Sequence, residues 1–81
     1  RPAAADVSGL RWGFLGAGKM ASALIGGMVR AGVARAESIV ASDPSAAALE
    51  GAASAGPIRA TSSNREVVEG SDVVVLAVKP Q

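Results

Sequence analysis

Short apolar runs alternate with segments of helical period along the 81 residues of the chain. The apolar runs predict buried strands, and they lie at Arg11–Leu15, Ser38–Ser42, Pro57–Thr61 and Asp72–Val78. Proline cannot donate to a strand ladder, so Pro57 places the third strand near an edge of the sheet. The last run is rich in valine without polar alternation, which is typical of a strand buried on both faces.

The segment between the first two strands, Lys19–Ala31, has the pattern of an amphipathic helix. Its larger apolar residues recur at the spacing of one helical face: Met20, Leu24, Met28 and Ala31. Gly32 follows at the position where a C-terminal cap is expected. Val33–Glu37 then forms a short surface connection to the second strand.

The second helix is expected over Ala46–Ala53, where alanine gives strong helix propensity. Asp43 is suited to cap this helix, and Pro44 to occupy its first position. Gly51 weakens the helix, and Gly56 ends it.

The third helix is expected to open with a capping box. Ser63 is the cap, Glu66 follows three residues later, and the helix ends at Gly70. Four strands then alternate with three helices, and this alternation predicts an α/β fold with a parallel sheet and right-handed crossovers. The expected strand order is 3-2-1-4.

A glycine turn, Gly16-Ala17-Gly18, joins the first strand to the first helix, and with Ala21 it fits the G-x-G-x-x-G/A fingerprint of dinucleotide-binding domains. Gly16 permits the sharp turn, Gly18 leaves room for a pyrophosphate beside the backbone, and Ala21 keeps the helix close to the sheet. The helix start offers N–H groups and a positive dipole end to phosphates. The sequence thus predicts a Rossmann-like parallel sheet, a partial dinucleotide-binding domain. A plain strand–helix unit with a tight glycine turn is the alternative.

Ligands of such sheets bind at the carboxyl ends of the strands, where the strand order reverses, here between the first and fourth strands. The candidate cofactor-binding residues at that edge are Gly16, Ala17, Gly18, Lys19, Met20, Ser42, Asp43, Asn64, Ala77, Val78, Lys79 and Pro80.

Asp43 stands about 20 residues after the glycine turn, as the fingerprint expects of a ribose-binding acid. A carboxylate there accepts hydrogen bonds from the ribose of NAD and repels the 2′-phosphate of NADP. Asp43 before Pro44 is equally suited to cap a helix. Ser42 and Ser45 are candidate donors to a 2′-phosphate, but no arginine directly follows the second strand. Both cofactors, NADPH and NADH, stay open.

Three other candidates also have two interpretations each. Lys19 is either a solvated first residue of its helix or a contact to the pyrophosphate. Asn64 either lies in the first turn of its helix or reaches the adenosine ribose with its amide. Lys79 is either a charge at a strand end or part of a rigid turn, Val78–Pro80, whose backbone groups line the cofactor cleft.

Composition argues against several other functions. The net charge is +1, basic residues are scattered, and aromatic residues make up 2%, which argues against a nucleic-acid surface. Without cysteine or histidine the chain has no thiolate metal site and lacks the commonest general base, and no metal is expected. No apolar run reaches membrane-spanning length. Residues 1–10 are expected to be a disordered lead-in, and the cytoplasm is the expected location.

Three segments of the chain resemble the pyrroline-5-carboxylate reductases: Gly13–Ala21, Ser63–Val68 and Ser71–Gln81, which ends in Val-Lys-Pro-Gln. The glycine segment is shared with many dehydrogenases, whereas the other two are more specific. The resemblance covers residues 12–81. It implies an enzyme that reduces a cyclic imine, pyrroline-5-carboxylate, to proline with NADPH or NADH.

The resemblance also implies a larger protein. Residues 11–81 would be the first part of its NAD(P)-binding Rossmann domain, and a helical domain absent from this chain would form a homo-oligomer and complete the imine pocket. Catalytic residues are expected there, so none is assigned here. Two alternatives remain: a related two-domain hydroxy-acid dehydrogenase, whose usual Asn-Arg-Thr after the second strand is replaced by Ser42-Asp43-Pro44, and a non-catalytic dinucleotide-sensing module.

Overall fold

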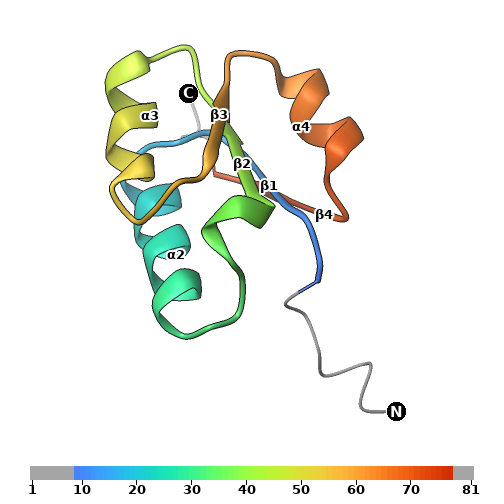
Figure 1. Ribbon diagram of the computed structural model, residues 1–81. Coiled ribbons are helices and arrows are strands. Elements are labelled where there is room, and N and C mark those ends of the chain that lie inside the picture. The colour runs from blue at the N-terminus through green and yellow to red at the C-terminus, as the bar shows by residue number, and fades with distance from the viewer. Residues whose placement is uncertain (1–8, 78–81) are drawn as a thin grey trace.

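The computed structural model describes residues 9–77, which form a four-stranded parallel sheet in the order β3-β2-β1-β4 (Figure 1). The predicted α/β class and strand order are confirmed. The elements are β1 (Trp12–Leu15), α2 (Lys19–Arg30), the 3-10 helix η1 (Ala36–Ser38), β2 (Ile39–Ser42), α3 (Ala46–Ala53), β3 (Arg59–Thr61), α4 (Asn64–Gly70) and β4 (Val73–Leu76). Most of the predicted lead-in, residues 1–8, lies outside the described residues, as do Val78, Lys79 and Pro80.

Two helices cover one face of the sheet, and the third covers the other (Figure 1). The connections from β1 to β2 and from β2 to β3 run in the same direction, so right-handed crossovers put α2 and α3 on the same face. The connection from β3 returns past β2 and β1 to reach β4, and this reversal puts α4 on the opposite face. The strand order therefore switches between β1 and β4.

The main core lies between the sheet and the pair α2 and α3, and small residues make up most of it. Its three large members, Phe14, Ile25 and Ile39, are each 0% exposed. The other buried members are Ala17, Ala21, Ala34, Ala41, Ala52 and Ala77. Alanines at these positions let both helices approach the sheet closely.

The face of α2 that packs on the sheet differs from the predicted one. Met20 and Leu24 are 66% and 44% exposed, whereas Ala21 and Ile25 are buried. Both pairs have helical spacing, but the buried pair is shifted by one residue from the predicted pair. The small side chain of Ala21 suits the point where the helix leaves the glycine turn close to the sheet, and this contact sets the rotation of the helix.

The strand β4 is not buried on both faces, contrary to the prediction. Val75 packs against the main core, but Val74 and Leu76 on the other face are 39% and 73% exposed. β4 is an edge strand of the described sheet, and α4 packs on β1, β2 and β3 instead. A continuous valine run shows that a strand is apolar, but it does not show whether both of its faces are covered.

The capping box of α4 forms only in part. Ser63 is the cap, as predicted, and its Oγ accepts a hydrogen bond from the Glu66 N–H at 3.2 Å. The Glu66 carboxylate does not reach back to the Ser63 N–H. Thr61 stands between them: its hydroxyl donates to Glu66 Oε1 at 3.3 Å, and its Oγ1 accepts from the Ser63 N–H at 3.0 Å.

Gly13 in β1 lets α4 pack directly against the sheet. A Cβ atom at Gly13 would overlap the Ser71 hydroxyl and lie 2.6 Å from Val67 Cγ1. Val67 is itself 0% exposed and is the buried residue of α4. The absence of a side chain at Gly13 therefore sets the distance between α4 and β1.

The Gly13→Ala substitution should destabilise the protein by about 1–3 kcal/mol, because overpacking at this contact forces α4 to move. Urea unfolding followed by circular dichroism measures the loss. Gly27→Ala is the matched control: a Cβ at Gly27 meets nothing within 4 Å, and alanine is the better helix former. A Gly13→Ala protein as stable as the wild type would show that α4 does not pack this closely.

An ion pair joins the start of β1 to the start of β4 and makes stability depend on pH. Asp72 accepts hydrogen bonds from the Arg11 side chain at 3.2 and 3.3 Å and from the Arg11 backbone N–H at 2.7 Å. The side-chain hydrogen bond, followed by the backbone one, lowers the pKa of the Asp72 carboxyl below its ordinary value of 3.8. The unfolded chain therefore binds this proton more readily than the folded protein does.

This contribution to stability should be fully present above the ordinary pKa of 3.8 and be lost as the pH falls through the lower folded value. Urea unfolding at a series of acidic pH values measures it. Asp72→Asn should lose less stability than the wild type over this range, because the substituted side chain no longer titrates. Identical declines in both proteins would contradict a role for Asp72.

Candidate functional site

The carboxyl ends of the strands bring the predicted segments together at one edge, which we call the carboxyl edge. Leu15 at the end of β1 stands opposite Ser42 of β2 and Leu76 of β4. The Gly16 N–H donates to the Ser42 carbonyl at 2.8 Å, and the Ala77 N–H donates to the Leu15 carbonyl at 2.9 Å. The glycine turn thus lies between the ends of β2 and β4, as predicted.

The two glycines of the turn serve different purposes. Gly16 has φ of 111°, a left-handed conformation that favours glycine, and it makes the sharp turn out of β1. Gly18 has an extended backbone with φ of −74°, and a Cβ atom there would meet nothing within 4 Å. The fold therefore requires glycine at Gly16, whereas at Gly18 it only leaves free space beside the backbone.

The N-terminus of α2 has no side-chain cap and no acidic residue in its first turn. The first hydrogen bond that closes the helix is donated by the Ser22 N–H to the Gly18 carbonyl at 2.9 Å, so the preceding N–H groups have no carbonyl partner in the helix. Lys19 and Met20 are exposed there. This end of the helix is suited to hold an anion.

An open hollow of about 540 Å³ lies between the start of α2 and α3. Its lining is made mostly of small residues: Ala17, Gly18, Lys19, Ser22, Ala47, Ala48 and Gly51. The volume lies within the range of roughly 300–1,000 Å³ that is usual for small-molecule sites. Sequence reasoning missed the α3 side of this hollow, where the signal was a set of small residues, Ala46–Ala48 and Gly51, opposite the glycine turn that precedes α2.

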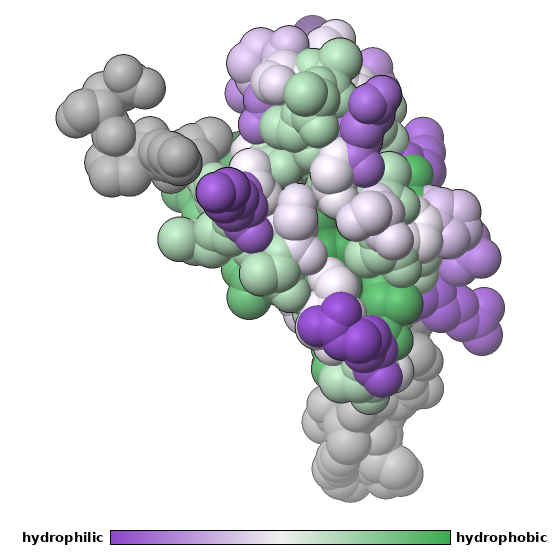
Figure 2. Space-filling model, turned by 90° about the vertical axis from the view of Figure 1, so that its left-hand side faces the viewer, coloured by the Kyte–Doolittle hydropathy of each residue, from purple (hydrophilic) through white to green (hydrophobic). Residues whose placement is uncertain are grey.

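Figure 2 shows the side of the molecule on which α2 and α3 lie, where hydrophilic residues are scattered among hydrophobic residues and residues of intermediate hydropathy. No group of histidine, cysteine, aspartate or glutamate residues able to hold a metal ion occurs within residues 9–77. In the same range, no helix is both long enough and apolar enough to cross a membrane.

The Asp43 carboxylate links the end of β2 to the glycine turn. Its Oδ2 accepts a hydrogen bond from the Ala17 N–H at 2.9 Å, and its Oδ1 accepts one from the Ser45 N–H at 2.8 Å. These bonds, that from Ala17 first, lower the pKa of the Asp43 carboxyl below its ordinary value. Each oxygen keeps a lone pair that can accept a further hydrogen bond.

The predicted capping role of Asp43 is wrong, because Ser45 is the cap of α3. The Ser45 Oγ accepts a hydrogen bond from the Ala48 N–H at 3.2 Å. Asp43 instead bonds the N–H two residues on, the turn that aspartate commonly makes, so Pro44 precedes the helix and does not begin it. The long-range bond to Ala17 could not be found from local sequence.

Ser42 and Asn64 meet at the same edge. Ser42 is 1% exposed, and its hydroxyl donates to Asn64 Oδ1 at 2.5 Å. Asn64 is the first residue of α4 and is exposed. The structure thus brings both of these predicted residues to the carboxyl edge, together with the glycine turn, Asp43 and Ala77.

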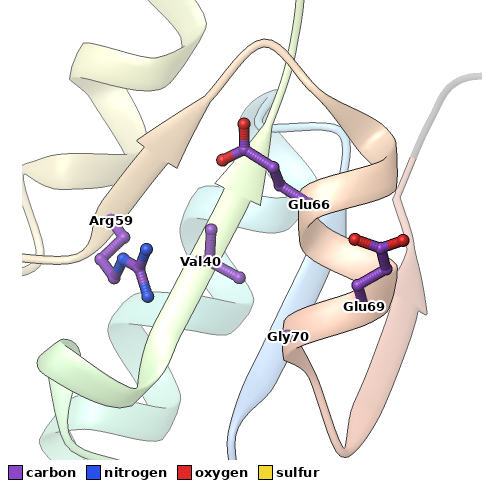
Figure 3. Close-up of a pocket in the computed structure, with 5 residues that line it drawn as sticks. All are labelled: Val40, Arg59, Glu66, Glu69 and Gly70. Carbon is purple, nitrogen blue, oxygen red and sulfur yellow. The ribbon is translucent and has the colours of Figure 1, made fainter.

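A second hollow, of about 270 Å³, lies on the opposite face of the sheet (Figure 3). Arg59 of β3 stands on one side, Glu66 and Glu69 of α4 stand on the other, and Val40 of β2 lies between them. No residue of the glycine turn lines this hollow, and it does not reach the start of α2. It is therefore separate from the carboxyl edge.

Comparison with known proteins agrees with this geometry. Residues 11–81 match a family described as NADP oxidoreductase, coenzyme F420-dependent. A solved structure of Plasmodium falciparum pyrroline carboxylate reductase with NADP bound is 29% identical, with a TM-score of 0.71. The match covers 89% of this chain and 25% of that one.

Two curated relatives are named pyrroline-5-carboxylate reductase. The one from Pseudomonas aeruginosa is 49% identical over 88% of this chain, and the one from Methanosarcina acetivorans is 45% identical over 85%. The chain spans about a quarter of their length, 26% in both cases. The resemblance noted from the sequence is confirmed. The chain belongs to the F420-dependent NADP oxidoreductase family, and within it is similar to the cofactor-binding part of pyrroline-5-carboxylate reductases.

Proposed function

We propose that this chain is the cofactor-binding part of an enzyme that reduces pyrroline-5-carboxylate to proline with NADPH or NADH. The observation that carries the proposal is the uncapped N-terminus of α2. It directly follows the glycine turn and lies where the strand order reverses, between β1 and β4. Family membership and the names of the relatives support it. When bound, the nicotinamide supplies a hydride to the imine carbon.

The residues at the carboxyl edge fit such a cofactor. The backbone from Gly16 to Met20 would hold the pyrophosphate, with Ala17 kept in place by Asp43. Asp43 and Asn64 would face the adenosine ribose, with the buried Ser42 behind Asn64. Ala77 and the predicted segment 78–80 would line the cofactor cleft. Gly18 supports this assignment because the space beside it is open.

The remaining parts of the proposal rest on the resemblance. The imine pocket and the catalytic residues would belong to a helical domain outside this chain. The whole protein would be a homo-oligomer in the cytoplasm, and light scattering on the intact protein tests its assembly. The names of the relatives favour imine reduction over oxidation of a hydroxy acid. Turnover of pyrroline-5-carboxylate by the intact protein would exclude a purely sensing role.

Gly18→Val should abolish measurable dinucleotide binding while the protein still folds. The added side chain would fill the space beside the turn in which the pyrophosphate is expected, and its Cβ atom meets no protein atom within 4 Å. Loss of the glycine cap should cost on the order of 1 kcal/mol of stability. Calorimetric titration of NADPH and NADH into the intact variant measures the affinity.

Gly27→Val is the matched control for this experiment. It places the same side chain near the C-terminal end of α2, and its Cβ atom again meets nothing within 4 Å. Its affinity for both dinucleotides should equal that of the wild type. Unchanged affinity in Gly18→Val would mean that the turn does not hold the phosphates.

Asp43→Ser should raise the efficiency with NADPH relative to NADH by about three- to tenfold. Two like charges about 4 Å apart repel by roughly 4 kcal/mol at an effective dielectric of about 20, and water at the exposed edge reduces this. The N–H groups of Ala17 and Ser45 offset part of the Asp43 charge. We therefore expect the wild type to lean only modestly towards NADH.

The ratio of kcat/KM values for the two cofactors is the appropriate measurement, because a general loosening of the glycine turn affects both equally. Asp72→Ser is the matched control: it removes a carboxylate at the start of β4, where Asp72 pairs with Arg11. This control should leave the ratio unchanged. An unchanged ratio in Asp43→Ser would show that Asp43 does not discriminate between the cofactors and serves only to hold the Ala17 N–H.

A further inference from the structure

We propose that Ser42 is a positioning residue that fixes the carboxamide of Asn64 with its Nδ2 group directed outward at the carboxyl edge. There the amide donates to an oxygen of the adenosine ribose or of its 2′-phosphate. This inference rests on the proposed dinucleotide binding and adds how one polar side chain is prepared for it.

Because Ser42 is buried, its hydroxyl depends on one hydrogen-bond acceptor within the protein. Ser42 is 1% exposed, so water does not satisfy its hydroxyl, and an unpaired buried hydroxyl is costly. Within residues 9–77 the hydroxyl proton is donated only to Asn64 Oδ1, at 2.5 Å. The bond joins residues 22 positions apart, at the end of β2 and the start of α4.

The same bond decides which way the amide faces. If Nδ2 faced Ser42, the serine oxygen would accept from it, and the serine proton would need another acceptor in a buried place. With Oδ1 towards Ser42, both groups are satisfied. The two N–H donors of the amide then lie on the outer side, since Asn64 is exposed and Ser42 is not.

The backbone on both sides of this bond is also held. The Ser42 carbonyl accepts from the Gly16 N–H at 2.8 Å, which ties Ser42 to the glycine turn. Ser63, the cap of α4, holds the turn of helix in which Asn64 lies. The amide is thus fixed relative to the turn before a ligand binds, which reduces the entropic cost of binding.

The chemistry of the amide complements that of Asp43. Both Asp43 oxygens already accept hydrogen bonds and can only accept more, so they suit ribose hydroxyls. The Asn64 amide is neutral and donates, so it suits a hydroxyl oxygen and suits a phosphate oxygen better. Loss of its N–H groups should therefore affect NADPH more than NADH.

A double-mutant cycle in the intact protein tests the inference, with calorimetric titration of NADPH and of NADH as the readout. Ser42→Ala and Asn64→Ala should each weaken NADPH binding about five- to tenfold, the usual effect of one hydrogen bond. Because Ser42 acts through Asn64, the double variant should bind no more weakly than Asn64→Ala alone.

Two further variants separate positioning from stability. Ser54→Ala is the matched control: it also loses a hydroxyl hydrogen bond, to the Gly51 carbonyl at 2.7 Å, but at the far end of α3. It should bind NADPH as the wild type does. Asn64→Asp keeps an oxygen for Ser42 and suits the first turn of a helix, so its melting temperature should hold while NADPH affinity falls at least tenfold.

The outcomes are distinguishable. A wild-type protein that binds neither dinucleotide overturns the proposed function together with this inference. If the wild type binds, wild-type affinity in Ser42→Ala, or additive losses in the double variant, overturns the positioning role alone. Should Ser42→Ala fail to fold, Asn64→Asp decides the matter: undiminished NADPH affinity in that folded variant shows that the outward N–H groups are not used.

Discussion

The register of β1 with its two neighbours is the constraint on which the rest of this structure depends. Leu15 stands opposite both Ser42 and Leu76, so β2, β1 and β4 end at one level. Gly16 then leaves the sheet with φ of 111° while its N–H bonds the Ser42 carbonyl. The start of α2, the end of β2 and the end of β4 meet because of this register. A shift by one residue would reverse the faces of β1 and remove Phe14 from the main core.

Local patterns in the sequence were sufficient to predict the fold and most of the candidate site. Alternating strands and helices, joined by right-handed crossovers, leave few possible strand orders, and the dinucleotide-binding fingerprint favours the observed one among them. The glycine fingerprint places the turn, and the strand ends then place Ser42, Asp43 and Asn64 at the same edge. These predictions succeeded because each depends on chain direction and spacing, which are visible in sequence.

The details that failed depend on tertiary contacts. Asp43 is well suited locally to cap a helix, but its carboxylate bonds Ala17, 26 positions away. Larger apolar residues, Met20 and Leu24, suggested the packing face of α2, yet close approach to the sheet selects Ala21. Gly13 likewise appears in sequence as one more residue of a strand, and only the position of α4 shows why a side chain is excluded there.

The carboxyl edge offers an anion mainly backbone N–H groups, since no arginine directly follows β2 and Lys19 is the cation in the lining of the hollow beside α2. Backbone donors at the glycine turn would contact the pyrophosphate, which NADH and NADPH share, so they cannot distinguish the two. Under the proposed function, discrimination between NADH and NADPH would then depend on the side chains at the end of β2 and the start of α4. These are held by the two long-range bonds, Asp43 to Ala17 and Ser42 to Asn64. Of the four residues joined by these two bonds, only Ala17 belongs to the main core. Under the proposed function, cofactor preference could therefore change at these positions while the strand–turn–helix unit proposed to hold the pyrophosphate stays the same.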